Sequence, residues 1–183
     1  ASSSSYTLTF PATDPSADKM LQTDGSGNLS FVDAPSGKIK QIINNESSTN
    51  YEQNGSGETV CTNYNMTITP ESTSSKIIVA QNFNLFASDD NNTGYHEAQG
   101  YARMYRAISG GSTSQLLDNE MGVIESYVNS ETRQQRLYQI CMFSHVDSPN
   151  TTSAITYTLR LYSADSSYVV KTRHFSGYLL EVL

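Results

Sequence analysis

The chain has 183 residues, with 18 acidic and 11 basic side chains and a formal net charge of −7 at pH 7. This balance argues against a nucleic-acid-binding surface, which relies on clustered Lys and Arg. No apolar run approaches the roughly 20 residues of a membrane helix, so no membrane insertion is expected, and the first ten residues carry no secretory signal. The length fits one domain with a sizeable core plus a short appendage.

Residues 1–37 differ in kind from the rest of the chain. After the low-complexity ASSSS, one alternating strand is expected over residues 6–10, followed by a Pro-broken loop and the segment LQTDGSGNLSFV, residues 21–32. Its DG and GN dipeptides favour positive φ, which predicts a β-hairpin. A lone hairpin is barely stable in water, and the apolar groups here are too few for a core. We therefore expect a stem or attachment segment that needs neighbours, of which copies of the same chain are the simplest.

Residues 38–183 alternate polar and apolar residues almost throughout, as half-buried β-strands do. TVCTNYNMTI, residues 59–68, predicts one continuous strand with its even positions buried. KIIVAQNFNLFAS, residues 76–88, predicts another, with Ile77, Val79, Phe83 and Leu85 on one face. Further strands are expected in GYARMYRAI, as two short strands within residues 114–128, and in ITYTLRLYSA, SYVVKTR and GYLLEVL, the last two separated by a turn at Ser176-Gly177.

The segment RQQRLYQICMFSHV is apolar on both faces over residues 137–143, so it is expected to be a central strand of a sandwich. No window of the sequence sustains a helical apolar stripe. Seven or eight short strands separated by turns predict an all-β fold, in which a two-sheet β-sandwich with jelly-roll connectivity forms a head domain over residues 38–183.

Three phrases, in this order, resemble segments of tail-fibre and other appendage proteins of tailed bacteriophages, particularly marine ones. They are FPATDPSADKMLQTDGSGNLSFVDAP at residues 10–35, ITPESTSSKIIV at 68–79 and VDSPNTTSAITYTLRLYSADSSYVV at 146–170. The resemblance implies a virion structural protein that forms a homotrimer, with a slender N-terminal stem bound to other virion proteins and a globular β-sandwich head. It brings no catalytic residue with it.

A trimeric stem would give each hairpin the apolar neighbours that one copy lacks. Three sets of side chains would meet around a common axis, and each Å² of apolar surface buried there contributes about 25 cal/mol. The expected trimer contacts in the stem are Leu21, Leu29, Phe31 and Val32.

Neither the cysteines nor the histidines form a motif. Cys61 and Cys141 match no zinc or redox spacing, so buried free thiols are expected, with a disulfide between them as the alternative. His96, His145 and His174 are isolated, and no pair has the spacing of a metal site. We expect no metal and no cofactor.

Enzymatic signals are equally weak. The sequence has no nucleophile elbow and no phosphate-binding loop. Asp118, Glu120 and Glu125 could hydrolyse glycosides as in tailspike enzymes, but proximity in sequence fixes no separation across a cleft. The loop SDDNNTGYHE, residues 88–97, offers oxygen ligands for calcium without an EF-hand register, so a plain turn is expected. The chain is therefore expected not to be an enzyme.

Binding is the better-supported class of function. The chain has 12 Tyr and six Phe but no Trp, and Tyr mixed with Asn, Asp, Arg and Ser is typical of saccharide and protein recognition. The candidate ligand-binding residues are Tyr95, Tyr101, Tyr105 and Tyr127. The alternative is that these side chains line the sandwich or a subunit interface.

Two functions remain open, both located in the virion. In the first, the head binds the host cell through a surface glycan or an outer-membrane protein. In the second, the chain is a capsid-attached fibre or decoration protein with a purely structural role.

Overall fold

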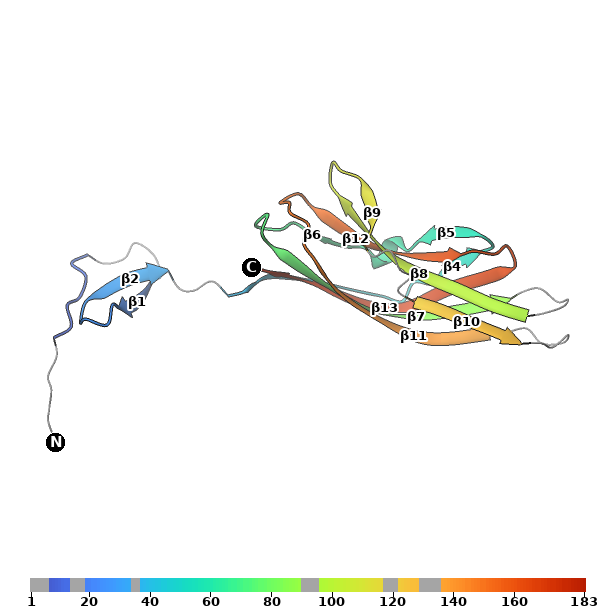
Figure 1. The fold of residues 1–183 in the computed structure, drawn as a ribbon, viewed down its shortest axis with the longest axis horizontal. Coiled ribbons are helices and arrows are strands. Elements are labelled where there is room, and N and C mark those ends of the chain that lie inside the picture. Colours follow the sequence, from blue (N-terminus) through green and yellow to red (C-terminus); the bar gives the residue numbers. More distant parts are fainter. Residues whose placement is uncertain (1–6, 14–18, 34–36, 90–95, 117–121, 129–135) are drawn as a thin grey trace, which may run out of the picture. The chain divides into compact units, whose positions relative to one another are not determined.

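The structure is a computed structural model that describes residues 7–13, 19–33, 37–89, 96–116, 122–128 and 136–183 (Figure 1). The chain divides into two compact units, residues 1–38 and 39–183. Among the described residues, no helix is long and apolar enough to cross a membrane.

The first unit contains the predicted hairpin. Strand β1 (Lys19–Thr23) pairs antiparallel with β2 (Leu29–Asp33). In the loop between them, Gly25 and Gly27 take positive φ values of 78° and 95°. The Asp24 carboxylate closes the loop by accepting hydrogen bonds from the Ser26 and Asn28 amides, at 2.7 and 3.1 Å.

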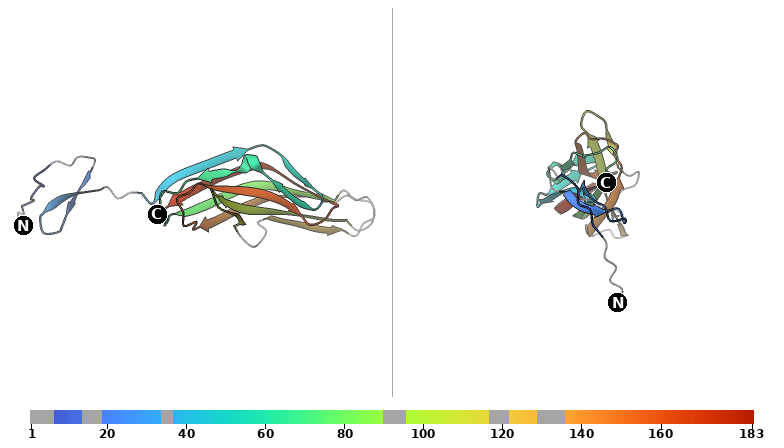
Figure 2. Two further views of the ribbon diagram at one scale, coloured as in Figure 1. Left: turned by 90° about the horizontal axis from the view of Figure 1, so that it is seen from above. Right: turned by 90° about the vertical axis from the view of Figure 1, so that its left-hand side faces the viewer.

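The second unit is a sandwich of two antiparallel sheets (Figures 1 and 2). One sheet has the strand order β10-β8-β12-β5, with β6 and β9 pairing at its margins, and the other has the order β11-β7-β13-β3, with β4 beside β13. The strands are β3 (Ile39–Ser47), β4 (Tyr51–Asn54), β5 (Gly57–Val60), β6 (Met66–Ile68), β7 (Lys76–Asp89), β8 (His96–Ile108), β9 (Thr113–Gln115), β10 (Gly122–Val128), β11 (Arg136–Asp147), β12 (Ile155–Ser163) and β13 (Tyr168–Val182).

The eight main strands interleave as in a jelly roll. Taken in chain order as β3, β5, β7, β8, β10, β11, β12 and β13, the first lies beside the last and the second beside the seventh. This is the arrangement produced when a long antiparallel hairpin wraps into two facing sheets. The predicted all-β jelly-roll sandwich is therefore confirmed.

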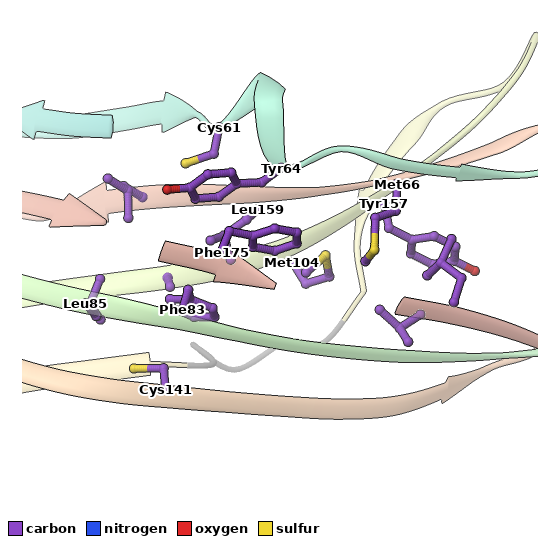
Figure 3. Close-up of a cluster of buried hydrophobic side chains, with 14 of the residues drawn as sticks. Cys61, Tyr64, Met66, Phe83, Leu85, Met104, Cys141, Tyr157, Leu159 and Phe175 are labelled. Atoms are coloured by element: carbon purple, nitrogen blue, oxygen red, sulfur yellow. The ribbon is translucent and has the colours of Figure 1, made fainter. Parts of the chain in front are cut away.

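Alternation along the strands builds the core between the sheets (Figure 3). The predicted inward residues of β7, from Ile77 to Leu85, are at most 1% exposed. Tyr64 stacks on Phe175 with ring centroids 4.6 Å apart, and Tyr51 meets its edge at 5.1 Å. Because most inward positions are large and apolar, burial of this layer is the main stabilising term of the fold.

The continuous strand predicted over residues 59–68 is wrong. Strand β5 ends at Val60, Cys61 turns the backbone, and the 3-10 helix η1 (Thr62–Tyr64) follows before β6. As a result Val60 points outward and is 41% exposed, whereas Tyr64 and Met66 are buried. Because η1 interrupts the extended backbone between β5 and β6, the even-numbered side chains of residues 59–68 do not all lie on one face.

Two further predictions about strands are corrected. The apolar segment expected to be a central strand is β11, which pairs with β7 and lies at the edge of its sheet within the described residues. The turn expected at Ser176-Gly177 is absent, because β13 runs through it as one strand. A bulge between Arg173 and Ser176, where His174 takes a φ of 57°, absorbs the irregularity instead.

Candidate binding surface

The outward side of the β10-β8-β12-β5 sheet carries a group of interacting aromatic and charged side chains. Inward positions of β8 and β12, such as Met104 and Leu159, are buried, so the alternate positions project away from the core. We call the outward group the tyrosine–arginine ladder, and its members are Tyr101, Arg103 and Tyr105 of β8, Arg160 and Tyr162 of β12, and Glu58 of β5.

Strand register brings these residues together. Arg103 pairs directly with Arg160, Tyr101 with Tyr162, and Tyr162 in turn with Glu58. Each guanidinium then crosses to the diagonal neighbour: Arg103 Cζ lies 3.6 Å from the centroid of the Tyr162 ring, and Arg160 Cζ lies 3.8 Å from that of Tyr105. Both are cation–π contacts at close range.

Glu58 forms ion pairs with both arginines. Its Oε1 accepts hydrogen bonds from Arg103 Nη1 at 3.2 Å and from the Tyr105 hydroxyl at 2.8 Å, and its Oε2 accepts one from Arg160 Nη1 at 3.1 Å. Burial alone would raise the pKa of Glu58. The hydrogen bonds from Tyr105, Arg160 and Arg103 together lower this pKa by more than burial raises it, so the net shift is downward. The carboxylate therefore stays ionised between two cations at neutral pH.

The structure places two of the four predicted binding tyrosines in this surface. Tyr101 and Tyr105 both project outward from β8, and the Tyr101 ring lies 5.6 Å from that of Tyr162. Tyr127 belongs to β10, where its backbone pairs with Glu97. Tyr95 lies outside the described residues.

Sequence reasoning missed the arginines, Tyr162 and Glu58. Their signal is present locally, because YARMYR and RLY alternate Tyr with Arg at the outward spacing of a strand. What no local pattern indicates is that the three strands are neighbours in this register.

The hairpin brings together three of the four predicted stem residues. Leu21 pairs with Phe31, and Leu29 lies two positions along β2 on the same face. Val32 pairs with Met20 and lies on the opposite face, because side chains alternate along a strand. An ion pair between Lys19 and Asp33 closes the open end of the hairpin.

The remaining predicted chemistry gives no site among the described residues. There, no three His, Cys, Asp or Glu side chains lie close enough together to hold a metal ion. Cys61 and Cys141 are buried free thiols, so the disulfide alternative is not formed. Asp118 and Glu120, like most of the proposed calcium loop, lie outside the described part of the chain, and Glu125 falls on β10.

No protein-family model matches the chain, and no curated protein matches its sequence. Among solved structures it is similar to the infectious bursal disease virus VP2 subviral particle, with 14% identity and a TM-score of 0.41 over 85% of this chain and 35% of that one. The structure of the Gx strain of that virus gives 10% identity and a TM-score of 0.38, over 94% of this chain and 41% of that one. The chain thus spans less than half the length of these proteins, and its function is inferred from its own residues.

Proposed function

We propose that this chain is a bacteriophage virion structural protein, a trimeric tail-fibre-like appendage whose sandwich head binds the host cell surface. The observation that carries the proposal is the apolar hairpin: Leu21 is 43% exposed, and its cross-strand partner Phe31 is only partly buried. The resemblance of this hairpin phrase to phage appendage proteins supports the class of protein.

The stem follows from the physics of the hairpin. Two five-residue strands with a single apolar pair and one further Leu on a face give little burial within one chain. When identical hairpins meet around a symmetry axis, each copy covers the exposed apolar face of its neighbours, so no other partner is needed. Residues 1–37 would then serve both as the trimer stem and as the attachment to other virion proteins.

The head would use the tyrosine–arginine ladder for recognition. The side chains of Arg103, Arg160 and Glu58 are a quarter exposed or less, so a ligand would meet the tyrosines more than free charge. A surface glycan, rich in hydroxyl groups, fits that chemistry better than a charged peptide does.

The test is labelling of bacteria with the fluorescent full-length protein, across a panel of marine hosts. We expect at least one host to be labelled, and the double variant Tyr101→Ala/Tyr162→Ala to lose most of that labelling. Thr67→Ala is the matched control, since Thr67 bonds Thr156 on the same outward face at 2.9 Å, away from the ladder. Equal labelling by the wild-type protein and the double variant would remove the ladder from the proposal.

One observation favours a purely structural role, as a capsid-attached fibre or decoration protein. Within the ladder, both arginines and the Tyr105 hydroxyl already bind groups of the same chain. A surface whose polar groups are satisfied internally has less to offer a ligand. Failure to label any permissive host, with the protein located on the capsid, would decide for this role.

A further inference from the structure

Strand β11 exposes a column of large apolar side chains although it belongs to a folded sheet. Its outward residues Tyr138, Ile140 and Met142 are 58%, 67% and 78% exposed, and Val146 further along is 52% exposed. The inward residue Cys141 of the same strand is 3% exposed. The strand is therefore apolar on both faces, but its own chain covers only one.

The column continues across the sheet as an apolar row. Val146 pairs with Ile78, Ile78 with Leu180, and Leu180 with Ile42, so four neighbouring strands present an aliphatic side chain in line. Ile42 is 61% exposed, and Tyr178, one outward position before Leu180, is 45% exposed. We call the column and the row together the apolar outer face.

The outward side of the opposite sheet has a different composition, with polar and aromatic side chains in place of aliphatic ones. There the outward positions of β8 and β12 carry Tyr and Arg side chains that contact one another, and Thr156 of β12 bonds Thr67 of β6. On the apolar outer face, six side chains are between 45% and 78% exposed. Together these six residues expose roughly 700 Å², which is of the order of one partner's share of a stable interface.

We propose that the apolar outer face is a subunit interface, covered by the sandwich of a second copy of this chain. The inference deepens the proposed function and rests on it for the presence of a neighbouring copy. Hairpins associated in a stem would hold the sandwiches at high local concentration, because Ile39 of the sandwich directly follows Lys38 of the hairpin unit.

Charge also favours a second copy as the occupant. The chain carries a net charge of −7, so two copies repel each other unless they meet through a neutral surface. The outward positions of β11 from Tyr138 to Val146, and of β7 from Ile78 to Phe86, contain no charged residue. Charged side chains on this face of the sheet stand on β13 and β3, where Lys171 pairs with Phe86, Arg173 with Asn84, and Glu46 with Ser176. The uncharged strip along β11 and β7 in an acidic protein is suited to contact with a second copy.

Methionine oxidation tests the proposal on the full-length protein. Peroxide oxidises a thioether according to its exposure, and Met142 is 78% exposed in a single copy, whereas Met66 and Met104 are 1% exposed and give the buried limit. The exposed reference is a Val60→Met variant, whose new side chain occupies an outward position on the other sheet. Rates are followed by peptide mass spectrometry, alongside the mass of the assembly.

We expect Met142 to be oxidised at least about tenfold more slowly than the methionine introduced at position 60. The variant Ile140→Lys, which places a cation beside Met142 at a position that one chain leaves exposed, should restore the fast rate. Fast oxidation of Met142 in wild-type protein overturns the proposal. If the protein then still has three times the chain mass, the trimeric stem is retained and only the interface at the apolar outer face is rejected. If the protein has the mass of one chain, both the trimeric stem and this interface are rejected.

Discussion

At the scale of single residues, Glu181 shows how the sandwich closes one of its ends. This carboxylate is fully buried, and it accepts hydrogen bonds from the Ser75 hydroxyl, the Gln41 amide and the Glu71 backbone N–H. Burial by itself would raise the pKa of Glu181, but these hydrogen bonds outweigh it and hold the pKa below the ordinary 4.5. The residue fastens the loop before β7 to the last strand.

Replacing Glu181 with Gln should lower the free energy of unfolding at neutral pH by about 2 kcal/mol, because donors that now bind a charged acceptor would meet an amide. A depressed pKa in the folded state stabilises the protein above the unfolded pKa, and this stabilisation is lost as the pH falls through the folded value. The variant should therefore lose less stability than wild type below pH 4.5. Urea unfolding across the acid range measures this. The control is Glu46→Gln, at an exposed position of β3, which is expected to change little.

The two thiols should be unreactive until the protein unfolds. Burial raises the pKa of Cys61 to about 12 and also raises that of Cys141, so little thiolate is present at pH 8. A chromogenic disulfide reagent should react slowly with the native protein and should titrate two thiols in denaturant. Recovery of no thiol from unreduced, denatured protein would show the disulfide that the structure lacks.

At the scale of elements, the tyrosine–arginine ladder joins three strands through one carboxylate. Arg103 and Arg160 lie directly opposite each other on β8 and β12, which would be unfavourable without Glu58 between them. The side chains are partly exposed, so the net contribution of the group is modest.

Glu58→Gln should lower the free energy of unfolding by about 1 kcal/mol at low ionic strength, with much of the loss recovered at high salt. Salt screens the repulsion between the two guanidinium groups once the carboxylate is gone. Glu52→Gln is the matched control, because it removes the same charge from an ion pair with a single cation, Lys171, at 2.7 Å. An equal loss in both variants at both salt concentrations would contradict the role given to Glu58.

The elements also show what the sequence can and cannot predict. Alternation predicted β7 and β8 and the inward residues Phe83 and Leu85, because a half-buried strand must alternate. Alternation did not predict the edge position of β11. Apolar residues on both faces of a strand indicate that both faces are covered, but they do not show whether the same chain or another chain covers each face. Likewise Tyr101 and Tyr105 could be proposed as binding residues, whereas Glu58 could not, since its partners lie far away in sequence and meet it only through strand register.

At the scale of the whole molecule, two surfaces exceed what one chain buries: the hairpin face around Leu21 and the apolar outer face around Met142. The first belongs to residues 1–38 and the second to residues 39–183.

Removal of residues 1–37 should therefore weaken association between copies without abolishing it, since the sandwich would keep its own contact. Light scattering over a dilution series measures the shift. A truncated protein that stays trimeric, with unchanged thermal stability, would show that the hairpin contributes nothing to assembly.

The mass of the full-length protein in solution decides whether identical partners complete this chain. Sedimentation equilibrium should give about 60 kDa, three times the 20.1 kDa chain mass. A mass of 20.1 kDa that persists as the concentration is raised would show that one copy is complete by itself.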